Sequence, residues 1–235
     1  MDLTTPFVDN DGDGNNSMID INTANAKAIG LLPANDSVVD AFITFSSQFD
    51  WDFDQSDGID ANLLDFVGVA AHEIGHALGF VSGVDNLEFF FDEVTDEELT
   101  KVTPLDLFRY STQSEAEGSG IIDATADARN KYFSLDNGQT SLARFSTGQI
   151  YGDGWQASHW KDDLGIGLMD PTAEPPGGLM MISDLDILAF DVVGWNINRP
   201  PTLTSIATLP GGIEDTPLTI TYDTRLAASD AADPE

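Results

Sequence analysis

The chain has 235 residues, of which 41% are apolar and 9% aromatic, enough to form a folded core. Its 41 acidic and nine basic residues give a formal net charge of -32, which disfavours binding to nucleic acid and to anionic membranes. The absence of cysteine excludes disulfides, thiolate metal sites and cysteine nucleophiles, and no apolar run is long enough to span a membrane.

An Asp-rich segment, residues 9–20, comes first in the chain (DNDGDGNNSMID). Its oxygen donors and its Gly at the sixth position match the calcium loop of an EF-hand, although Asp20 replaces the usual glutamate and the preceding residues do not look helical. Two interpretations remain open. Either Asp9, Asp11, Asp13 and Asp20 bind calcium, or the segment is a plain acidic turn. The first residues lack the basic and apolar regions of a signal peptide.

The segment Val38–Phe53 is rich in β-branched and aromatic residues, so we expect a strand there, followed by a turn at residues 55–58. An extended peptide substrate is expected to pair with this strand if it lies at an edge of the sheet. The aspartates in and after it form either a second hard-cation cluster or the solvated side of a strand: Asp50, Asp52, Asp54 and Asp57.

The clearest helix is predicted over residues 60–80, with Asp65 as N-cap and Gly79 at the C-terminal end. An apolar stripe and two histidines fall on opposite sides of this helix. Glycine is unfavourable inside a helix by roughly 1 kcal/mol against alanine, so a row of glycines on one face predicts a close approach of another backbone. The stripe consists of Val67, Ala71, Ile74 and Leu78, and the row of Gly68, Gly75 and Gly79.

Two further elements are predicted downstream. Residues 133–145 have the pattern of a β-hairpin with Asn137-Gly138 in its turn. A second helix is expected over Ile182–Val193, because Ser183 and Asp186 approximate a capping box and Gly194 follows its end. Together these elements predict the α+β class.

The Pro-Pro pair in Asn198-Arg-Pro-Pro201 marks the end of the first domain, which we place at residues 1–197. Residues 198–235 read as a linker and the start of a β-sandwich module of cadherin or immunoglobulin type. A complete sandwich needs about 100 residues. We therefore expect the chain to be a piece of a longer protein that stops inside this module.

The segment Ala71–Phe80 (AHEIGHALGF) carries the strongest chemical signal. His72 and His76 are four residues apart, so on a helix both imidazoles can reach one zinc ion. Glu73 lies beside them, where it can take a proton from a metal-bound water and deliver it to a leaving amine. This is the H-E-x-x-H signature of zinc peptidases.

A catalytic zinc ion needs a third protein ligand and one open position. The only other histidine of the chain is His159, in SHWK, and a short turn that contains a methionine (LMDP) follows it. Acidic residues are the alternatives for the third ligand: Asp85, Glu97 and Glu98.

HEIGHALGF, SHWK and LMDP together resemble the metzincin metalloproteases, most closely the leishmanolysin-like branch in secreted multidomain proteins of bacterial type. The resemblance covers residues 38–196. It implies His72, His76 and His159 as zinc ligands, Glu73 as general base and Met169 as the Met-turn residue beneath the metal. It also implies a fold with a small mixed sheet, an active-site helix and a C-terminal helix after the Met-turn.

The chain departs from the family pattern at two positions. The short metzincin motif has a histidine where this chain has Ser82, so the fold has to bring in His159. Pro171 stands where some members carry a tyrosine. Met180 and Met181 are alternatives to Met169, but they directly precede the second helix and lack the spacing from His159, which favours a packing role.

We therefore expect a secreted or cell-surface zinc metalloendopeptidase that acts on proteins or peptides and has no nucleic-acid partner and no membrane span. The alternative is a calcium-dependent adhesion protein in which this domain is a non-catalytic binding module. The position of Glu73 favours the enzyme, because a structural zinc site fills its fourth position with a protein ligand and needs no base.

Overall fold

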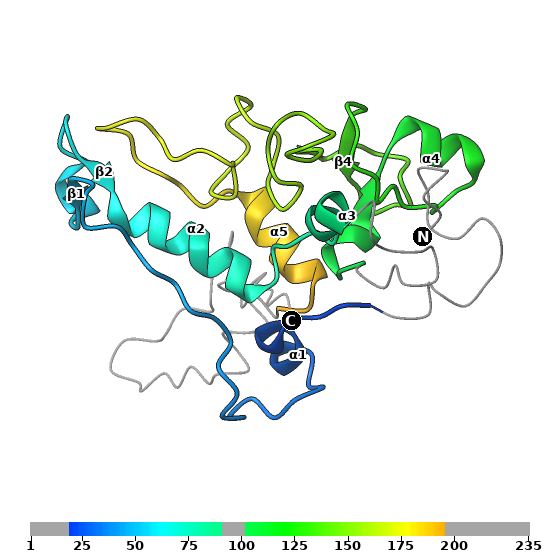
Figure 1. The fold of residues 1–235 in the computed structure, drawn as a ribbon, viewed down its shortest axis with the longest axis horizontal. Helices are drawn as coiled ribbons and strands as arrows, with labels where there is room; N and C mark the ends of the chain where they lie inside the picture. The colour runs from blue at the N-terminus through cyan, green and yellow to red at the C-terminus, as the bar shows by residue number, and fades with distance from the viewer. Residues whose placement is uncertain (1–18, 91–101, 196–235) are drawn as a thin grey trace, which may run out of the picture. The chain divides into compact units, whose positions relative to one another are not determined.

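The computed structural model describes residues 19–90 and 102–195 (Figure 1). The helices are α1 (Thr23–Ala28), α2 (Phe66–Leu78), α3 (Val84–Phe90), α4 (Thr112–Glu117) and α5 (Asp184–Val192), with 3-10 turns η2 (Gln55–Asp57) and η4 (Leu105–Phe108). The strands are β1 (Trp51–Asp52), β2 (Leu64–Asp65), β3 (Arg109–Tyr110), β4 (Lys131–Phe133) and β5 (Ala143–Phe145).

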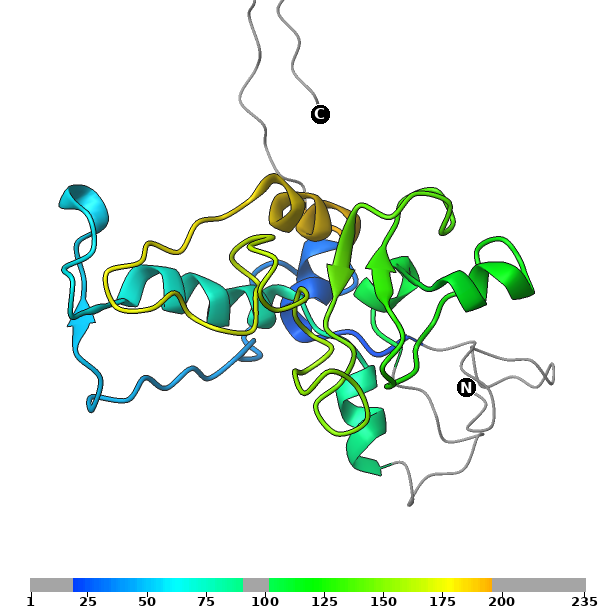
Figure 2. The same ribbon diagram turned by 90° about the horizontal axis from the view of Figure 1, so that it is seen from above.

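The strands form two small sheets. β1 and β2 pair in parallel, whereas β3, β4 and β5 form an antiparallel sheet in that order. Figure 2 shows the antiparallel sheet beside α5, with α2 running away from both. The fold is therefore α+β, as predicted from the sequence.

The main core lies between the antiparallel sheet, the end of α2 and α5. The indole ring of Trp160, which is fully buried, stacks on Phe145 with the ring centroids 5.0 Å apart. It also packs edge to face against Phe80, with the ring centroids 4.9 Å apart. Met169 is buried in the same cluster. Both His159 and the second helical histidine, His76, are thus close in sequence to core residues that fix the local backbone.

Helix α2 has the predicted ends. The Asp65 carboxylate accepts a hydrogen bond from the amide of Gly68 at 2.9 Å, which caps the N-terminus. Gly79 has a φ of 117°, the left-handed conformation in which a helix commonly ends. The helix begins at Phe66 rather than at residue 60, because Leu64 and Asp65 pair with β1 instead.

The two faces of α2 differ from the sequence-based interpretation. Gly68, His72 and Gly75 are buried, while Val67 and Ile74 of the apolar stripe are 41% and 47% exposed. The glycines do mark close approaches, but side chains make them rather than a second backbone. A β-carbon at Gly68 would lie 2.5 Å from the Cβ of Met180, and one at Gly75 would lie 2.5 Å from the Sδ of Met169.

The predicted strand over Val38–Phe53 is wrong in extent. Only Trp51 and Asp52 pair in a sheet, and residues 39–46 have no regular secondary structure. High β-propensity does not make a strand without a neighbour to pair with. The turn at 55–58 is confirmed as η2 followed by Gly58.

The two downstream elements are confirmed, with a hairpin that begins two residues earlier than predicted, at Lys131, and a shorter helix. β4 and β5 pair antiparallel across residues 134–142, and Asn137 and Gly138 both have positive φ. α5 begins after the N-cap Ser183, which forms the predicted capping box with Asp186, and Gly194 follows its end.

Several predictions concern residues outside the described ranges: the β-sandwich module at 198–235, three of the four candidate calcium ligands (Asp9, Asp11, Asp13) and the acidic alternatives Glu97 and Glu98. In the part of the chain that the structure describes, no helix is long and apolar enough to cross a membrane.

Candidate metal site

The three histidines of the chain meet at one point. The Nε2 atom of His76 lies 3.1 Å from the Nε2 of His72 and 3.1 Å from the Nε2 of His159. His72 and His159 are buried, and His76 is half-buried. Among the described residues this is the one group of three or more histidine and acidic side chains close enough together to hold a metal ion.

The other ring nitrogen of each histidine faces a backbone carbonyl. Nδ1 of His72 lies 2.8 Å from the oxygen of Leu168, and Nδ1 of His76 lies 2.8 Å from that of Phe80. Nδ1 of His159 lies 3.2 Å from the oxygen of Gln156. A carbonyl oxygen can only accept, so each Nδ1 carries the hydrogen of a neutral imidazole. Each Nε2 therefore presents a lone pair to the common point.

Burial favours the neutral imidazoles that bind metals. It is the main cause that lowers the pKa of His76. Burial and, after it, the neighbouring imidazoles of His76 and His72 together lower the pKa of His159 to about 3. At neutral pH the rings of His76 and His159 therefore do not carry the charge that would repel a cation.

The distances between the Nε2 atoms fit a transition-metal site. Two ligands about 2.1 Å from a tetrahedral zinc ion lie about 3.4 Å apart. The two Nε2–Nε2 contacts of 3.1 Å are close to this value. Without a cation, three lone pairs would face one another in a buried place with no hydrogen to share. The donor set and its orientation therefore fit a metal ion.

His159 reaches the site because its segment adds to the edge of the antiparallel sheet. The amide of Ser146 donates to the carbonyl of His159 at 3.0 Å, and the amide of Lys161 donates to that of Arg144 at 2.8 Å. Trp160 then donates its amide to Met169 at 2.9 Å. These bonds join β5, the His159 segment and the turn at Met169.

Asp85, an alternative third ligand in the sequence analysis, supports the His159 segment instead. Its carboxylate accepts hydrogen bonds from the amides of Ala157 (2.6 Å) and Ser158 (3.1 Å) and from the Ser158 hydroxyl. It does not belong to the group of side chains at the histidine site. Burial raises the pKa of Asp85, as expected for a carboxyl group away from solvent.

Met169 packs beneath the two helical histidines. Its side chain is fully buried, and its Sδ fills the space next to Gly75, which lies between His72 and His76 on α2. The preceding carbonyl, that of Leu168, accepts the hydrogen bond from His72. The turn thus supports the site both through a side chain and through a backbone oxygen.

Asp186 is a supporting residue whose full role was not apparent from the sequence. Its fully buried carboxylate accepts hydrogen bonds from the amides of Leu168 (2.7 Å) and Met169 (3.2 Å) and from the indole N–H of Trp160 (2.8 Å). It also accepts the amide of Ser183, which completes the capping box of α5. The capping pattern indicated only this last role.

Glu73 follows His72 on α2 and is half-exposed. Its charge raises the pKa of His76, which places the carboxylate within electrostatic reach of the site. No hydrogen bond of the Glu73 carboxylate is found within the described residues, so no partner in that part of the chain holds it away from a water or substrate.

The second acidic cluster of the sequence analysis forms no metal cage among the described residues, and the first lies outside them except for Asp20. Asp20, the described member of the calcium pattern, donates its amide to Val102 at 2.8 Å. In the second cluster, the carboxylate of Asp52 accepts the amides of Asp54 and Asp60, and that of Asp54 accepts the amide of Ser56. Such bonds are those of local turns.

Three imidazoles with converging lone pairs define a site able to hold one metal ion. Comparisons of the chain with models of protein families, with curated proteins and with solved structures found no match.

Proposed function

We propose that the chain carries the catalytic domain of a zinc-dependent metalloendopeptidase of the metzincin class, similar to the leishmanolysin-like branch. The convergence of the Nε2 atoms of His72, His76 and His159 is the observation that carries this proposal. The motifs HEIGHALGF, SHWK and LMDP support it, as does the packing of Met169 below Gly75.

The chemistry of the ligands is compatible with zinc, and the H-E-x-x-H signature favours zinc among the metals that imidazoles bind. Neutral imidazoles suit zinc, copper, iron and nickel, whereas magnesium and calcium prefer oxygen. Three protein ligands with the fourth position open are typical of catalytic rather than structural zinc. A bound zinc ion supplies a Lewis acid for the scissile carbonyl and lowers the pKa of its water.

Glu73 is the general base in this proposal. The carboxylate accepts a proton from the attacking water and then donates it to the nitrogen of the leaving amine. Its place next to His72 on a capped helix fixes the backbone from which it acts, and its freedom from hydrogen bonds within the described residues leaves it able to do so. Export from the cell remains a prediction based on the family resemblance.

The test is zinc content and casein hydrolysis measured on the wild type, Glu73→Gln and His159→Ala. We expect one zinc ion per wild-type chain with hydrolysis. Glu73→Gln should retain zinc and lose at least about 100-fold in rate, within the usual contribution of acid–base catalysis. His159→Ala should lose zinc.

Glu117→Gln is the matched control, because Glu117 is an exposed glutamate on α4. It should keep both zinc and hydrolysis. Zinc without hydrolysis in the wild type would favour the binding-module alternative, and a wild type without zinc would contradict the proposal.

A further inference from the structure

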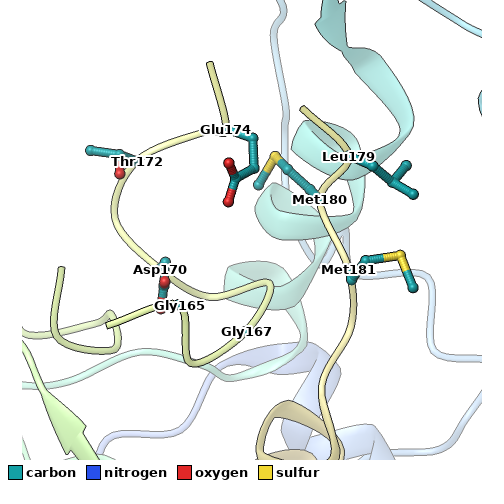
Figure 3. A pocket seen from close by; sticks show the side chains of 8 residues that line it. All are labelled: Gly165, Gly167, Asp170, Thr172, Glu174, Leu179, Met180 and Met181. Carbon is teal, nitrogen blue, oxygen red and sulfur yellow. The ribbon is translucent and has the colours of Figure 1, made fainter. Parts of the chain in front are cut away.

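A pocket lies directly after the turn that supports the histidine site. It has a volume of about 130 Å³ and lies between residues 165–174 and the returning segment 179–181, with α2 behind them (Figure 3). Asp170, Thr172 and Glu174 line one side, and Leu179, Met180 and Met181 line the other.

The pocket adjoins the site through the backbone and through α2. Asp170 comes two residues after Leu168, whose carbonyl oxygen accepts the hydrogen bond from His72. On the other side, the Cβ of Met180 lies against Gly68, one turn before His72, and the Met180 amide donates to Asp65 at 3.0 Å. A chain bound at the histidines can thus place a neighbouring side chain here.

The two carboxylates in the pocket have no cationic partner among the residues that the structure describes. No ion pair of Asp170 or Glu174 is found within the described residues, and the Oδ1 of Asp170 is buried without a hydrogen bond there. Burial is the largest cause that raises the pKa of Asp170 to about 6, and the charges of Asp186 and Asp162 add to it. Backbone hydrogen bonds from Gly167 and Ile166 offset part of this shift. A carboxylate with one buried oxygen that has no partner in this part of the chain gains from an added positive charge.

The shape and chemistry of the pocket select among cations. A metal ion would need several oxygen ligands around one point. Among the described residues no three carboxylates come together in this way, and the one group that could hold a metal ion consists of the three histidines. The Met180 side chain, which points toward Glu174 (Figure 3), and the carboxylates instead match a lysine or arginine side chain, which buries a hydrocarbon stem and carries its charge at the end. The volume suits a single side chain.

We propose that Asp170 and Glu174 form a specificity pocket for a basic side chain of a peptide substrate. The identity of the ligand as a substrate rests on the proposed peptidase function, whereas the preference for a basic side chain rests on the pocket alone. Substrates are then cationic peptides, in keeping with the net charge of -32.

The test measures binding in the zinc-loaded Glu73→Ala variant, so that it does not depend on hydrolysis. Fluorescently labelled hexapeptides carry one lysine at each position in turn, and a second set carries norleucine, which has no charge. At one position we expect the lysine peptide to bind about 10-fold more tightly than its norleucine counterpart, as a charged hydrogen bond of roughly 1.5–3 kcal/mol allows.

Adding Glu174→Gln should abolish this preference, and adding Glu174→Lys should reverse it in favour of a peptide with glutamate at that position. Glu174 is exposed, so these changes should leave folding intact, and Glu117→Gln serves as the control. Equal binding of lysine and norleucine peptides, no binding of either, or a preference unchanged by Glu174→Gln would overturn the proposal. A lysine preference in a wild type that hydrolyses no peptide would contradict only the peptidase function.

Discussion

The sulfur of Met169 occupies the space beside Gly75, so that a β-carbon on the helix would stand 2.5 Å from it. Gly75 lies one residue before His76 and three after His72. The glycine therefore lets the Met169 turn pack directly under the two helical histidines, and the neighbouring carbonyl of Leu168 reaches His72.

Gly75→Ala should destabilise the protein. At an unobstructed helical position this change stabilises by roughly 1 kcal/mol. Here overpacking against Met169 should outweigh that gain and give a net loss of about 1–2 kcal/mol in the free energy of unfolding, measured by urea titration. In the double variant Gly75→Ala/Met169→Ala the clash is absent, so the two changes should not be additive. Stabilisation by Gly75→Ala alone would contradict this packing.

Asp186→Asn should weaken the connection between α5, the Met169 turn and Trp160. In the variant an amide NH2 group replaces one carboxylate oxygen and faces an N–H group that now donates to that oxygen. Two donors then meet without an acceptor in a fully buried place. We expect a loss of about 2–4 kcal/mol in the free energy of unfolding. Asp184→Asn, exposed in the same helical turn, is the control and should cost less than about 1 kcal/mol. Equal effects of the two variants would argue against the connecting role.

Asp85→Ala should reduce metal affinity without removing a ligand. The change leaves the amides of Ala157 and Ser158 without their acceptor and frees the segment that carries His159. Loss of such supporting contacts typically costs 10–100-fold in metal affinity. Competition with a chelator measures the dissociation constant for zinc. Asn86→Ala, exposed on the same helix, should leave it unchanged; an unaltered affinity in Asp85→Ala would contradict the prediction.

The raised pKa of Asp170, about 6, predicts a pH dependence of stability. Between about pH 4 and pH 6 the folded state binds more protons at this group than the unfolded state does. The stability that protonated Asp170 contributes to the folded state is therefore present below about pH 4 and is lost as the pH rises through 6.

Asp170→Asn removes this dependence, because asparagine stays neutral. The variant should gain about 1 kcal/mol over the wild type at pH 7.5, after allowance for partial exposure to solvent, and almost nothing at about pH 3.5. Thermal unfolding of the two metal-free proteins at both pH values measures the difference. A gain that is the same at both pH values would show that titration of Asp170 is not its cause.

Helix α2 and α5 could be predicted from the sequence because their signals are local. Asp65 and Gly79 mark the ends of α2, and Ser183 with Asp186 marks the start of α5. The spacing of His72 and His76 likewise follows from the helical repeat alone.

The long-range parts of the site had weaker signals. His159 meets the other histidines only because Ser146 and Asp85, distant in sequence, hold its segment. The expected strand over Val38–Phe53 failed for the related reason that strand formation depends on a partner, which propensity does not reveal. The buried bonds of Asp186 to Leu168 and Trp160 left no pattern in the sequence beyond the capping box.

The coordination of zinc is the most direct measure of the central claim that three histidines hold one catalytic metal ion. X-ray absorption at the zinc edge counts imidazole ligands and gives their distances. We predict three imidazole nitrogens and one oxygen from water at about 2.0–2.1 Å in the wild type. His159→Ala should leave at most two imidazoles. A wild-type site with fewer than three imidazoles, or an imidazole count unchanged in His159→Ala, would contradict the account.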